Sequence, residues 1–332
     1  MILLSIGLPG DAAARCDAIA ARLVETALGP TELFAADTVE AIGAALVRLQ
    51  GRHAVIAARR PDAALRAVLA AGGARVLAIE DEPHAAVRDL LAQGLGLAAA
   101  TRAVATSCAA LVEAAALPGA AVLPAAEILA RPASLAAALG IDRGAAPPAP
   151  PPEPAAPWRD RLDPAARALV DGAVAAYAGT LRGGLLGEIV WDRGLLWRAG
   201  DPAQPASAAI ELAGGARELV AGPDIALPAG RWAATLTLAV SREAAGIAFA
   251  AELVAGAERR PLAAATVVPD GRGIGSATLP FAVDAATPQP LALRLATAGP
   301  AAAGRLALGN VTLVPAHGDA GALPVEFGSL GL

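Results

Sequence analysis

The chain of 332 residues contains no lysine, since all 26 of its basic residues are arginine. The absence of lysine excludes Schiff-base chemistry, a lysine general base and the lysine of a Walker phosphate-binding loop. Basic and acidic side chains are spread evenly along the chain, the formal net charge is −5, and no basic stripe is present. We therefore expect no nucleic-acid partner.

Cysteine and histidine are also scarce. Cys16 and Cys108 lie far apart and form no Cys-x-x-Cys pattern, which excludes a disulfide framework and a zinc ribbon. We expect two free, buried thiols. The three histidines, His53, His84 and His317, show no ligand spacing, so we expect no metal site. His84 follows a run of acidic residues, a context that indicates a solvated helix start.

Long hydrophobic runs are missing, although 56% of the residues are hydrophobic and about 28% are alanine. The longest stretches without an arginine or an acidic residue are 13 residues, Ala114–Ala126 and Leu306–Gly318. Because crossing a bilayer takes about 20 apolar residues, we expect no membrane span. The first apolar segment is broken by Pro9 and Asp11 and is typical of a buried strand, so we expect a cytoplasmic protein.

A proline-rich segment divides the sequence. Residues 144–157 read GAAPPAPPPEPAAP, which predicts an extended, semi-rigid linker. All four tryptophans and the single tyrosine follow this segment, whereas Phe34 is the only aromatic residue before it. The change in composition supports a domain on each side.

Before the linker, strand and helix patterns alternate, as in a parallel sheet covered on both faces. Short apolar runs predict strands at Ile2–Ile6, His53–Ala57 and Arg75–Ile79. Helical spacing and helix-start prolines predict helices at residues 11–28, 38–49, 61–71, 83–93, 98–116 and 123–139.

After the linker, Asp163 is expected to cap a helix that extends to about Ala178. The pattern then changes to period two, most clearly in Arg231–Ser241. Further strands are predicted at residues 246–253, 276–283, 290–296 and 305–314, with glycine and proline turns between them. Short strands at this spacing predict an all-β antiparallel sandwich of the jelly-roll type.

The segment Ile6-Gly-Leu-Pro-Gly-Asp-Ala-Ala-Ala-Arg15 links the first predicted strand to a helix, where free amides attract anions. This layout resembles the PAPS-dependent sulfotransferases, whose P-loop-like α/β fold has a first loop reading approximately Pro-Lys-Ser-Gly-Thr-Thr-Trp. Pro9 matches that loop. Gly10 takes the lysine position, Asp11 the next one, and Ala13 and Ala14 those of the paired threonines.

A second sulfotransferase element, an apolar strand followed by roughly Arg-Asn-Pro-Arg-Asp and then Ala-Val-Ser, resembles residues 75–89. Pro83 matches, but the arginine that binds the cofactor's 3′-phosphate becomes Asp81 and the serine becomes Asp89. Two unit charges ~4 Å apart interact by about 4 kcal/mol at an effective dielectric constant of ~20. Here the interaction is repulsive, because a carboxylate and a phosphate are both negative. The resemblance covers about residues 1–115 and implies a degenerate loop with no catalytic residues and no cofactor.

Two segments after the linker carry a second resemblance. They are Gly222–Trp232, which a strand of alternating apolar and polar residues follows, and Gly304–Val314. They resemble the carbohydrate-binding-module-like β-sandwiches of bacterial glycan-processing proteins, over about residues 205–315. Such modules stack aromatic rings on sugars and fix the hydroxyl groups with polar side chains. The resemblance implies a ligand-binding role for Trp191, Trp197, Trp232, Asp192, Arg193 and Arg198, with burial of the three rings in the core as the alternative.

These features predict an α/β domain at residues 1–143 and a helix followed by a β-sandwich at residues 158–332. We expect a non-catalytic glycan-binding or scaffolding protein linked to bacterial polysaccharide synthesis or modification. One alternative is a divergent sulfotransferase-like or other nucleotide-dependent transferase that uses Arg15 or Arg59 instead of lysine. Another is a structural protein that binds a protein partner or a second copy of itself.

Overall fold

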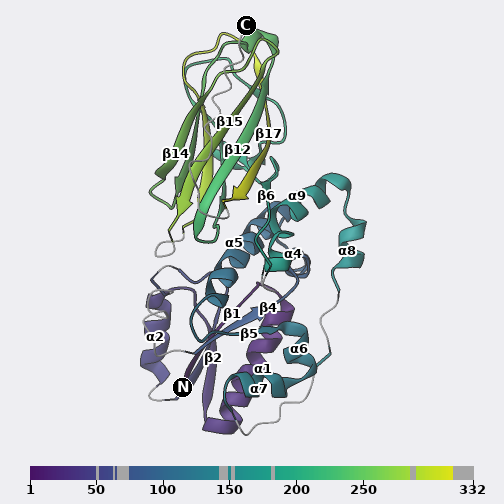
Figure 1. Ribbon diagram of the computed structural model, residues 1–332, viewed down its shortest axis with the longest axis vertical. Coiled ribbons are helices and arrows are strands. Elements are labelled where there is room, and N and C mark those ends of the chain that lie inside the picture. The colour runs from purple at the N-terminus through teal and green to yellow at the C-terminus, as the bar shows by residue number, and fades with distance from the viewer. Residues whose placement is uncertain are drawn as a thin grey trace.

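The computed structural model describes residues 1–49, 52–62, 64–65, 75–141, 149–150, 154–180, 184–284 and 289–316. An α/β domain and an antiparallel β-sandwich lie end to end along the long axis of the molecule, with helices between them (Figure 1). This arrangement confirms the predicted combination of a parallel α/β sheet and an antiparallel sandwich.

The α/β domain contains a parallel sheet with the strand order β2-β3-β1-β4-β5. The central strands β1 (Ile2–Gly7), β3 (His53–Ala58) and β4 (Arg75–Glu80) are apolar and buried, as predicted. The edge strands β2 (Thr31–Ala35) and β5 (Ala121–Pro124) are only partly buried, and the sequence pattern does not predict them.

Helices cover both faces of this sheet. Successive strand residues point to opposite sides, so an apolar strand presents apolar side chains on both faces. On β1, Leu3 belongs to the core on one face, whereas Leu4 and Ile6 belong to the core on the other. The first face is covered by α1 (Asp11–Leu28), α6 (Ala125–Ala130) and α7 (Pro132–Ala138). The second face is covered by α2 (Val39–Leu49), α4 (Pro83–Ala92) and α5 (Leu97–Ala115).

Two of the predicted helices do not correspond to single described helices. The helix predicted at residues 123–139 is instead β5 followed by α6 and α7, and α7 starts at Pro132, which has no amide to continue a preceding helix. The helix predicted at residues 61–71 lies mostly outside the described residues.

The sandwich has two antiparallel sheets. One has the order β14-β13-β16-β10-β7-β8, with β11 also on β16, and the other has the order β15-β12-β17-β6, with β9 also on β17. The inward residues Trp232, Ala234, Leu236 and Leu238 of β12 are buried, which confirms the period-two pattern. The first sheet contains β7 (Trp197–Arg198), β8 (Asp201–Pro205), β10 (Glu218–Ala221), β11 (Pro223–Ile225), β13 (Phe249–Ala255), β14 (Arg260–Val267) and β16 (Leu291–Thr297). The second contains β6 (Ile189–Trp191), β9 (Ile210–Glu211), β12 (Gly230–Val240), β15 (Ile274–Val283) and β17 (Arg305–Pro315).

Three short helices connect the two domains: α8 (Ala156–Arg161), α9 (Pro164–Val174) and α10 (Tyr177–Thr180). Asp163 caps α9, as predicted, by accepting a hydrogen bond from the amide of Ala166 at 2.8 Å. α9 packs on α4 and α5 on one side and on β6 on the other. Of the predicted linker, residues 144–148 and 151–153 lie outside the described residues, and its last two residues already belong to α8.

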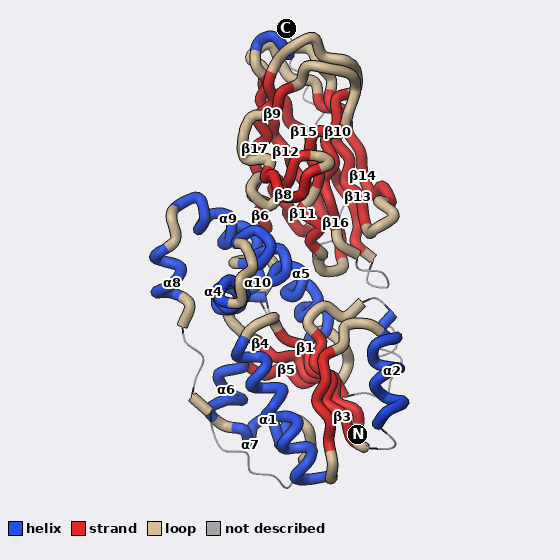
Figure 2. The backbone as a smooth tube through the Cα atoms, turned by 180° about the vertical axis from the view of Figure 1, so that it is seen from behind, coloured by secondary structure: helices blue, strands red, loops and turns tan. Residues whose placement is uncertain are grey.

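Helix α5 joins the two domains. It lies between the parallel sheet and the sandwich (Figure 2) and packs on β1 and β4 of the first and on β11 of the second. One continuous cluster of buried apolar side chains therefore extends through both domains. Among the described helices, α5 is the one that is long and apolar enough to cross a membrane, and 56% of its most apolar stretch is buried inside the protein.

Candidate functional site

Open α/β sheets bind ligands at the carboxyl ends of neighbouring strands whose connections leave in opposite directions. Here those strands are β1 and β4, which pair directly, and their exits bear the loop before α1 and the residue Asp81. This is the place where the sulfotransferase-like loop is predicted. Asp81 is half-buried and accepts a hydrogen bond from the amide of Glu82 at 2.8 Å.

The start of α1 already holds a negative charge. The amide of Asp11 donates to Oδ2 of Asp89, on α4, at 2.9 Å. Gly10 allows this approach, since a Cβ there would lie 3.0 Å from the same oxygen. Arg88 neutralises the carboxylate by pairing with its Oδ1 at 2.9 Å. A side chain of the protein therefore occupies the position that a phosphate would take at this helix start.

The two arginines considered as replacements for lysine are both engaged. Arg15 pairs with Asp11, one turn earlier on α1, at 3.4 Å. Arg59 pairs with the carboxylate of Asp17, which is buried and has its pKa raised by that burial. Of the other loop residues, Ala13 is buried, Pro9 is half-buried and Ala14 is exposed. None of these three offers a polar side chain to a ligand.

The three tryptophans that the sequence analysis assigns to sugar stacking lie inside the protein. Trp191 is fully buried, and Trp232 and Trp197 are 2% and 9% exposed. A ring enclosed in this way cannot stack on a sugar, so the alternative of core packing holds for all three. The aromatic content of the sequence does not show which face of a strand each ring occupies.

Trp197 fixes a loop at the junction of the domains. Its ring lies under the guanidinium of Arg102 on α5, with 5.3 Å between the guanidinium carbon and the ring centroid. On another side it meets Gly222, where a Cβ would lie 2.5 Å from the ring. Arg102 also donates to the carbonyl of Leu195 at 3.1 Å. Trp197 thus positions the start of β11 against α5.

Trp232 holds the next loop. Its Nε1 donates to the carbonyl of Pro228 at 3.1 Å, which fixes the segment between β11 and β12. Two of the predicted polar partners use their side chains within the protein: Asp192 Oδ1 accepts the amide of Gly194, and the guanidinium of Arg198 donates to the carbonyl of Ala209. Arg193 is exposed, and its backbone amide donates to Oδ1 of Asn310.

The loops that these tryptophans hold form one wall of a cleft between the domains, with a volume of about 330 Å³. The other walls are α5 and the exits of β2 and β3. Its polar lining residues are Asp37, Arg60, Asp62, Thr106, Glu113 and Asp224. Its apolar lining includes Ala109, Ala110, Ala226 and Leu227. Small-molecule sites are commonly apolar hollows of this size with a few fixed polar groups at a domain boundary.

The cleft is built across the domain boundary by direct hydrogen bonds. Thr106 on α5 accepts from the amide of Ala226 at 3.4 Å, and Glu113 on α5 accepts from the amide of Ala229 at 3.1 Å. Both donors belong to the segment that Trp232 holds. The two walls of the cleft are therefore tied together, and their separation is fixed by the fold.

Unusual backbone conformations lie beside the cleft. Among the described residues, the non-glycine residues with a positive φ are Asp224, at 58°, and Arg259, at 52°. Their side chains form an ion pair at 2.9 Å. Residues held in this conformation cost energy and concentrate at functional sites. The ion pair therefore joins two residues whose backbone conformations are energetically unfavourable, on the sandwich side of the cleft.

His84 is not a solvated helix start. It is buried, and its Nε2 lies 2.9 Å from Oδ1 of Asp171 on α9. Arg159 on α8 binds the same carboxylate, and this contact is the main reason that the pKa of Asp171 is lowered. His84 is buried through tertiary packing, because α9 packs on α4 and brings Asp171 to the imidazole.

Cys16 and Cys108 are free and buried, as predicted, and burial raises the pKa of the Cys16 thiol to about 12. His53 lies at the opposite edge of the sheet, with its Nε2 3.0 Å from the carbonyl of Leu28. His317 lies outside the described residues. Within the described part of the chain, no three metal-binding side chains converge.

No family model matches this chain, and no curated protein matches its sequence. The sandwich is similar to solved β-sandwich structures at low TM-scores. The xylan-binding module CBM15 is 15% identical, with 39% of this chain and 98% of that chain covered and a TM-score of 0.28. TmCBM61, solved with β-1,4-galactotriose, is 12% identical, with 39% and 88% covered and a TM-score of 0.25.

The same comparison finds two cyclase structures from Fischerella. The cyclase Fisc is 20% identical and an apo cyclase is 18% identical, each with 31% of this chain covered and a TM-score of 0.22. The aligned part spans 56% and 58% of those two chains. At such TM-scores these likenesses bear on no residue role, and the function proposed below depends on the cleft.

Proposed function

We propose that this chain is a non-catalytic glycan-binding protein and that the cleft between its domains holds the sugar. The observation that carries the proposal is the lining of the cleft, which places carboxylates and a guanidinium around an apolar surface. Sugars present hydroxyl groups at their edges and C–H groups on their faces, so they need this combination of polar rim and apolar wall. The volume of about 330 Å³ suits a segment of one or two sugar units.

The α/β domain serves in this proposal as a support for the cleft. Its predicted kinship with the sulfotransferases remains a proposal, supported by the glycine-containing loop between β1 and α1. Asp89 at the start of α1 speaks against a bound phosphate, because the amide of Asp11 is already engaged. For the same reason we favour glycan binding over nucleotide-dependent transfer.

Replacing Thr106 with leucine tests the location of the site. Thr106 is half-buried in the cleft wall, and Thr106→Leu removes a hydroxyl group and adds apolar bulk there. We expect affinity for a retained oligosaccharide to fall several-fold, as measured by affinity electrophoresis and calorimetry.

Thr237→Leu is the matched control, because Thr237 is exposed on the outer face of β12. This variant should bind as the wild type does, and thermal melts of both variants establish that they are folded. Unchanged binding in a folded Thr106→Leu protein contradicts the proposed location. Failure of the wild-type protein to bind any neutral, basic or acidic glycan contradicts the proposed function.

A further inference from the structure

The edge strand β2 carries a row of outward-facing backbone groups. It lies between α1 and α2 (Figure 1), and among the described strands it pairs with β3 alone, in an unbroken register. The carbonyl of Pro30 and the amide of Ala36 both bond to β3, so the even-numbered residues turn their backbone groups inward. The amide and carbonyl groups of Thr31, Leu33 and Ala35 therefore point away from the sheet.

The strands at the ends of the other sheet orders are protected in ways that native proteins commonly use. β14 and β15 pack against each other, and α9 covers β6. β8 contains Pro202 and Pro205, and β5 ends at Pro124, so these two strands lack some of the amides that a further strand would need. β2 has no proline, and its one charged residue, Glu32, pairs with Arg52 at 3.1 Å. Among these end strands, β2 is therefore the unprotected one.

Exposed apolar side chains accompany this edge. Leu33 lies on the α1 side of the sheet, beside Val55, and is 43% exposed. Leu28, in the last turn of α1, is 47% exposed. On the other side of the sheet, α2 exposes Val47 at 82%, with the small residue Gly43 one turn before it. Large apolar side chains gathered at one border of a protein are typical of an interaction surface.

The row of outward groups is complementary to itself. A second β2 strand that runs in the opposite direction, centred on Leu33, places the partner's Leu33 opposite Leu33 and the partner's Ala35 opposite Thr31. Each facing pair exchanges two backbone hydrogen bonds, as alternate pairs of an antiparallel sheet do. Facing residues share one side of a sheet, so the two leucines contact each other at the two-fold axis.

The size of this border fits a dimer. The five residues of β2 span about 17 Å, and the sheet with one layer of helices on each face is about 30 Å thick. Joining two such borders buries about 500 Å² on each copy, or about 1,000 Å² in total, which is the lower limit for a specific interface. An interface at this limit is typical of a reversible dimer.

We propose that two copies of this chain associate through β2 and continue their sheets into one another across a two-fold axis. The inference goes beyond the proposed glycan binding and does not depend on it. The cleft lies at the carboxyl ends of β2 and β3, and antiparallel pairing points these ends in opposite directions. The two clefts and the two sandwiches therefore lie at opposite ends of the dimer.

Analytical ultracentrifugation of the full chain tests the association. The mass should rise from 32.6 kDa towards twice that value as the protein concentration is raised through the micromolar range. Small-angle scattering should then show a particle longer than the monomer, because the sandwiches point away from each other. A monomer at every concentration overturns the proposal. Assembly beyond a dimer also overturns it, because a closed two-fold interface uses the β2 edges of both copies.

Two variants disrupt the interface in different ways. Leu33→Lys places like charges opposite each other at the two-fold axis. Ala35→Pro removes an outward amide and keeps the bonds to β3, since an edge strand tolerates proline where its N–H faces solvent. Each should weaken the dimer by about tenfold or more. Leu95→Lys is the matched control, because Leu95 is 38% exposed and lies outside β2. Thermal melts of dilute, monomeric samples establish that the variants are folded.

Leu33→Cys locates the contact by cross-linking. The Cα atoms of a hydrogen-bonded antiparallel pair are about 5.5 Å apart, within reach of a disulfide. Cys16 and Cys108 are buried, so mild oxidation should cross-link Leu33→Cys and leave Leu95→Cys as single chains on a non-reducing gel.

Three outcomes overturn β2 as the interface. They are dimers that persist in folded Leu33→Lys and Ala35→Pro, loss of the dimer in Leu95→Lys, and equal cross-linking of the two cysteine variants. None of these outcomes bears on glycan binding, which calorimetry measures separately.

Discussion

The carboxyl group of Asp81 is placed unfavourably for a charge. It lies at the exit of β4, and its Oδ2 is buried without a hydrogen-bond partner among the described residues. Burial raises its pKa from 3.8 to about 6, and the nearby Asp89 adds to the shift. The folded protein therefore binds this proton more tightly than the unfolded chain does. Asp81 costs stability above pH 6, and that cost disappears as the pH falls towards 4.

Asp81→Asn should accordingly stabilise the protein at neutral pH. We expect an increase in the free energy of unfolding of up to about 3 kcal/mol at pH 7 and little change at pH 4, because two pH units correspond to about 3 kcal/mol. Urea melts of the wild-type and variant proteins between pH 4 and 8 measure this difference. Parallel stability curves for the two proteins contradict a raised pKa at Asp81.

At the scale of elements, α1 and α4 are joined by a side chain that acts as a cap from a distance. α1 has no cap from its own N-cap residue, Gly10, and Asp89 on α4 supplies the acceptor instead. The carboxylate also suits the positive end of the helix dipole. The contact fixes the angle at which the first loop leaves β1.

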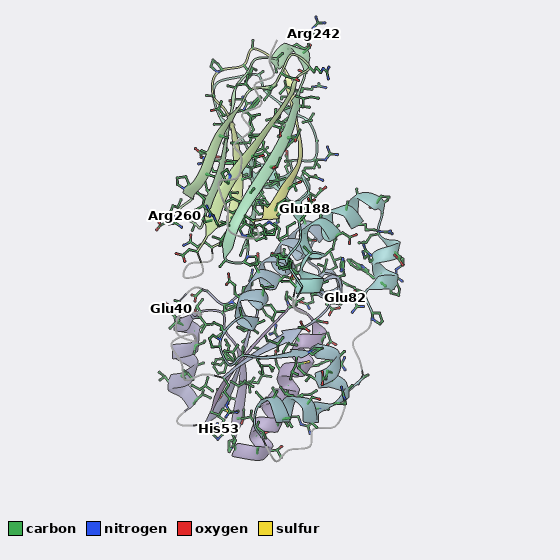
Figure 3. The ribbon with its side chains drawn as sticks, in the orientation of Figure 1. Glu40, His53, Glu82, Glu188, Arg242 and Arg260 are labelled. Atoms are coloured by element: carbon green, nitrogen blue, oxygen red, sulfur yellow. The ribbon has the colours of Figure 1, made fainter. Side chains whose placement is uncertain are left out.

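Asp89→Ala should lower the free energy of unfolding by about 1–2 kcal/mol, the usual cost of losing a helix cap. Glu188→Ala is the control, because Glu188 is an exposed acid near the domain junction (Figure 3) and its loss should change stability little. Chemical denaturation followed by circular dichroism measures both variants. If the two variants are equally stable, Asp89 does not cap α1.

Much of the element pattern can be predicted from sequence, for a local reason. β1, β3 and β4 are buried on both faces and therefore consist of apolar runs, and α1 repeats its apolar residues at helical spacing. β2 and β14 lie at sheet edges and are partly exposed, so their composition resembles that of loops. Edge strands depend on a neighbour for their hydrogen bonds, and the neighbour is not visible in the local sequence.

The candidate site depends on contacts between distant residues. His84 and Asp171 are 87 positions apart in the sequence but are hydrogen-bonded in the structure. The acidic residues next to His84 therefore wrongly predict a solvated helix start. The cleft residues Asp37 and Arg60 lie in the loops after β2 and β3, and Asp224 lies on β11, with no sequence spacing that links the three. The sequence does point to Trp197 and Trp232, but they lie one layer behind the cleft, where they hold its loops in place.

At the scale of the whole molecule, the two domains should behave as one unit. A continuous core runs through both, and α5 contacts the parallel sheet and the sandwich. Arg102 adds a contact over Trp197 and a hydrogen bond to the carbonyl of Leu195. A cleft whose walls are tied in this way keeps its shape without a ligand.

We expect a single unfolding transition. All four tryptophans follow the linker, so their fluorescence reports on the C-terminal part, whereas circular dichroism at 222 nm reports mainly on helices of the α/β domain. The two signals should give the same midpoint in urea. Two separate transitions in the wild-type protein contradict a shared core.

Arg102→Ala should lower the free energy of unfolding in the same urea melts by about 1–2 kcal/mol.

Hydrogen exchange with and without a bound oligosaccharide locates the ligand without a substitution and so decides whether the cleft is the binding site. We expect slower exchange at the amides of the cleft walls, around Arg60, along α5 near Thr106 and in the segment from Asp224 to Ala229. Exchange at the far end of the sandwich, around Arg242, should stay unchanged. Protection confined to an outer sheet face, with exchange in the cleft unaffected, would show that the glycan binds elsewhere.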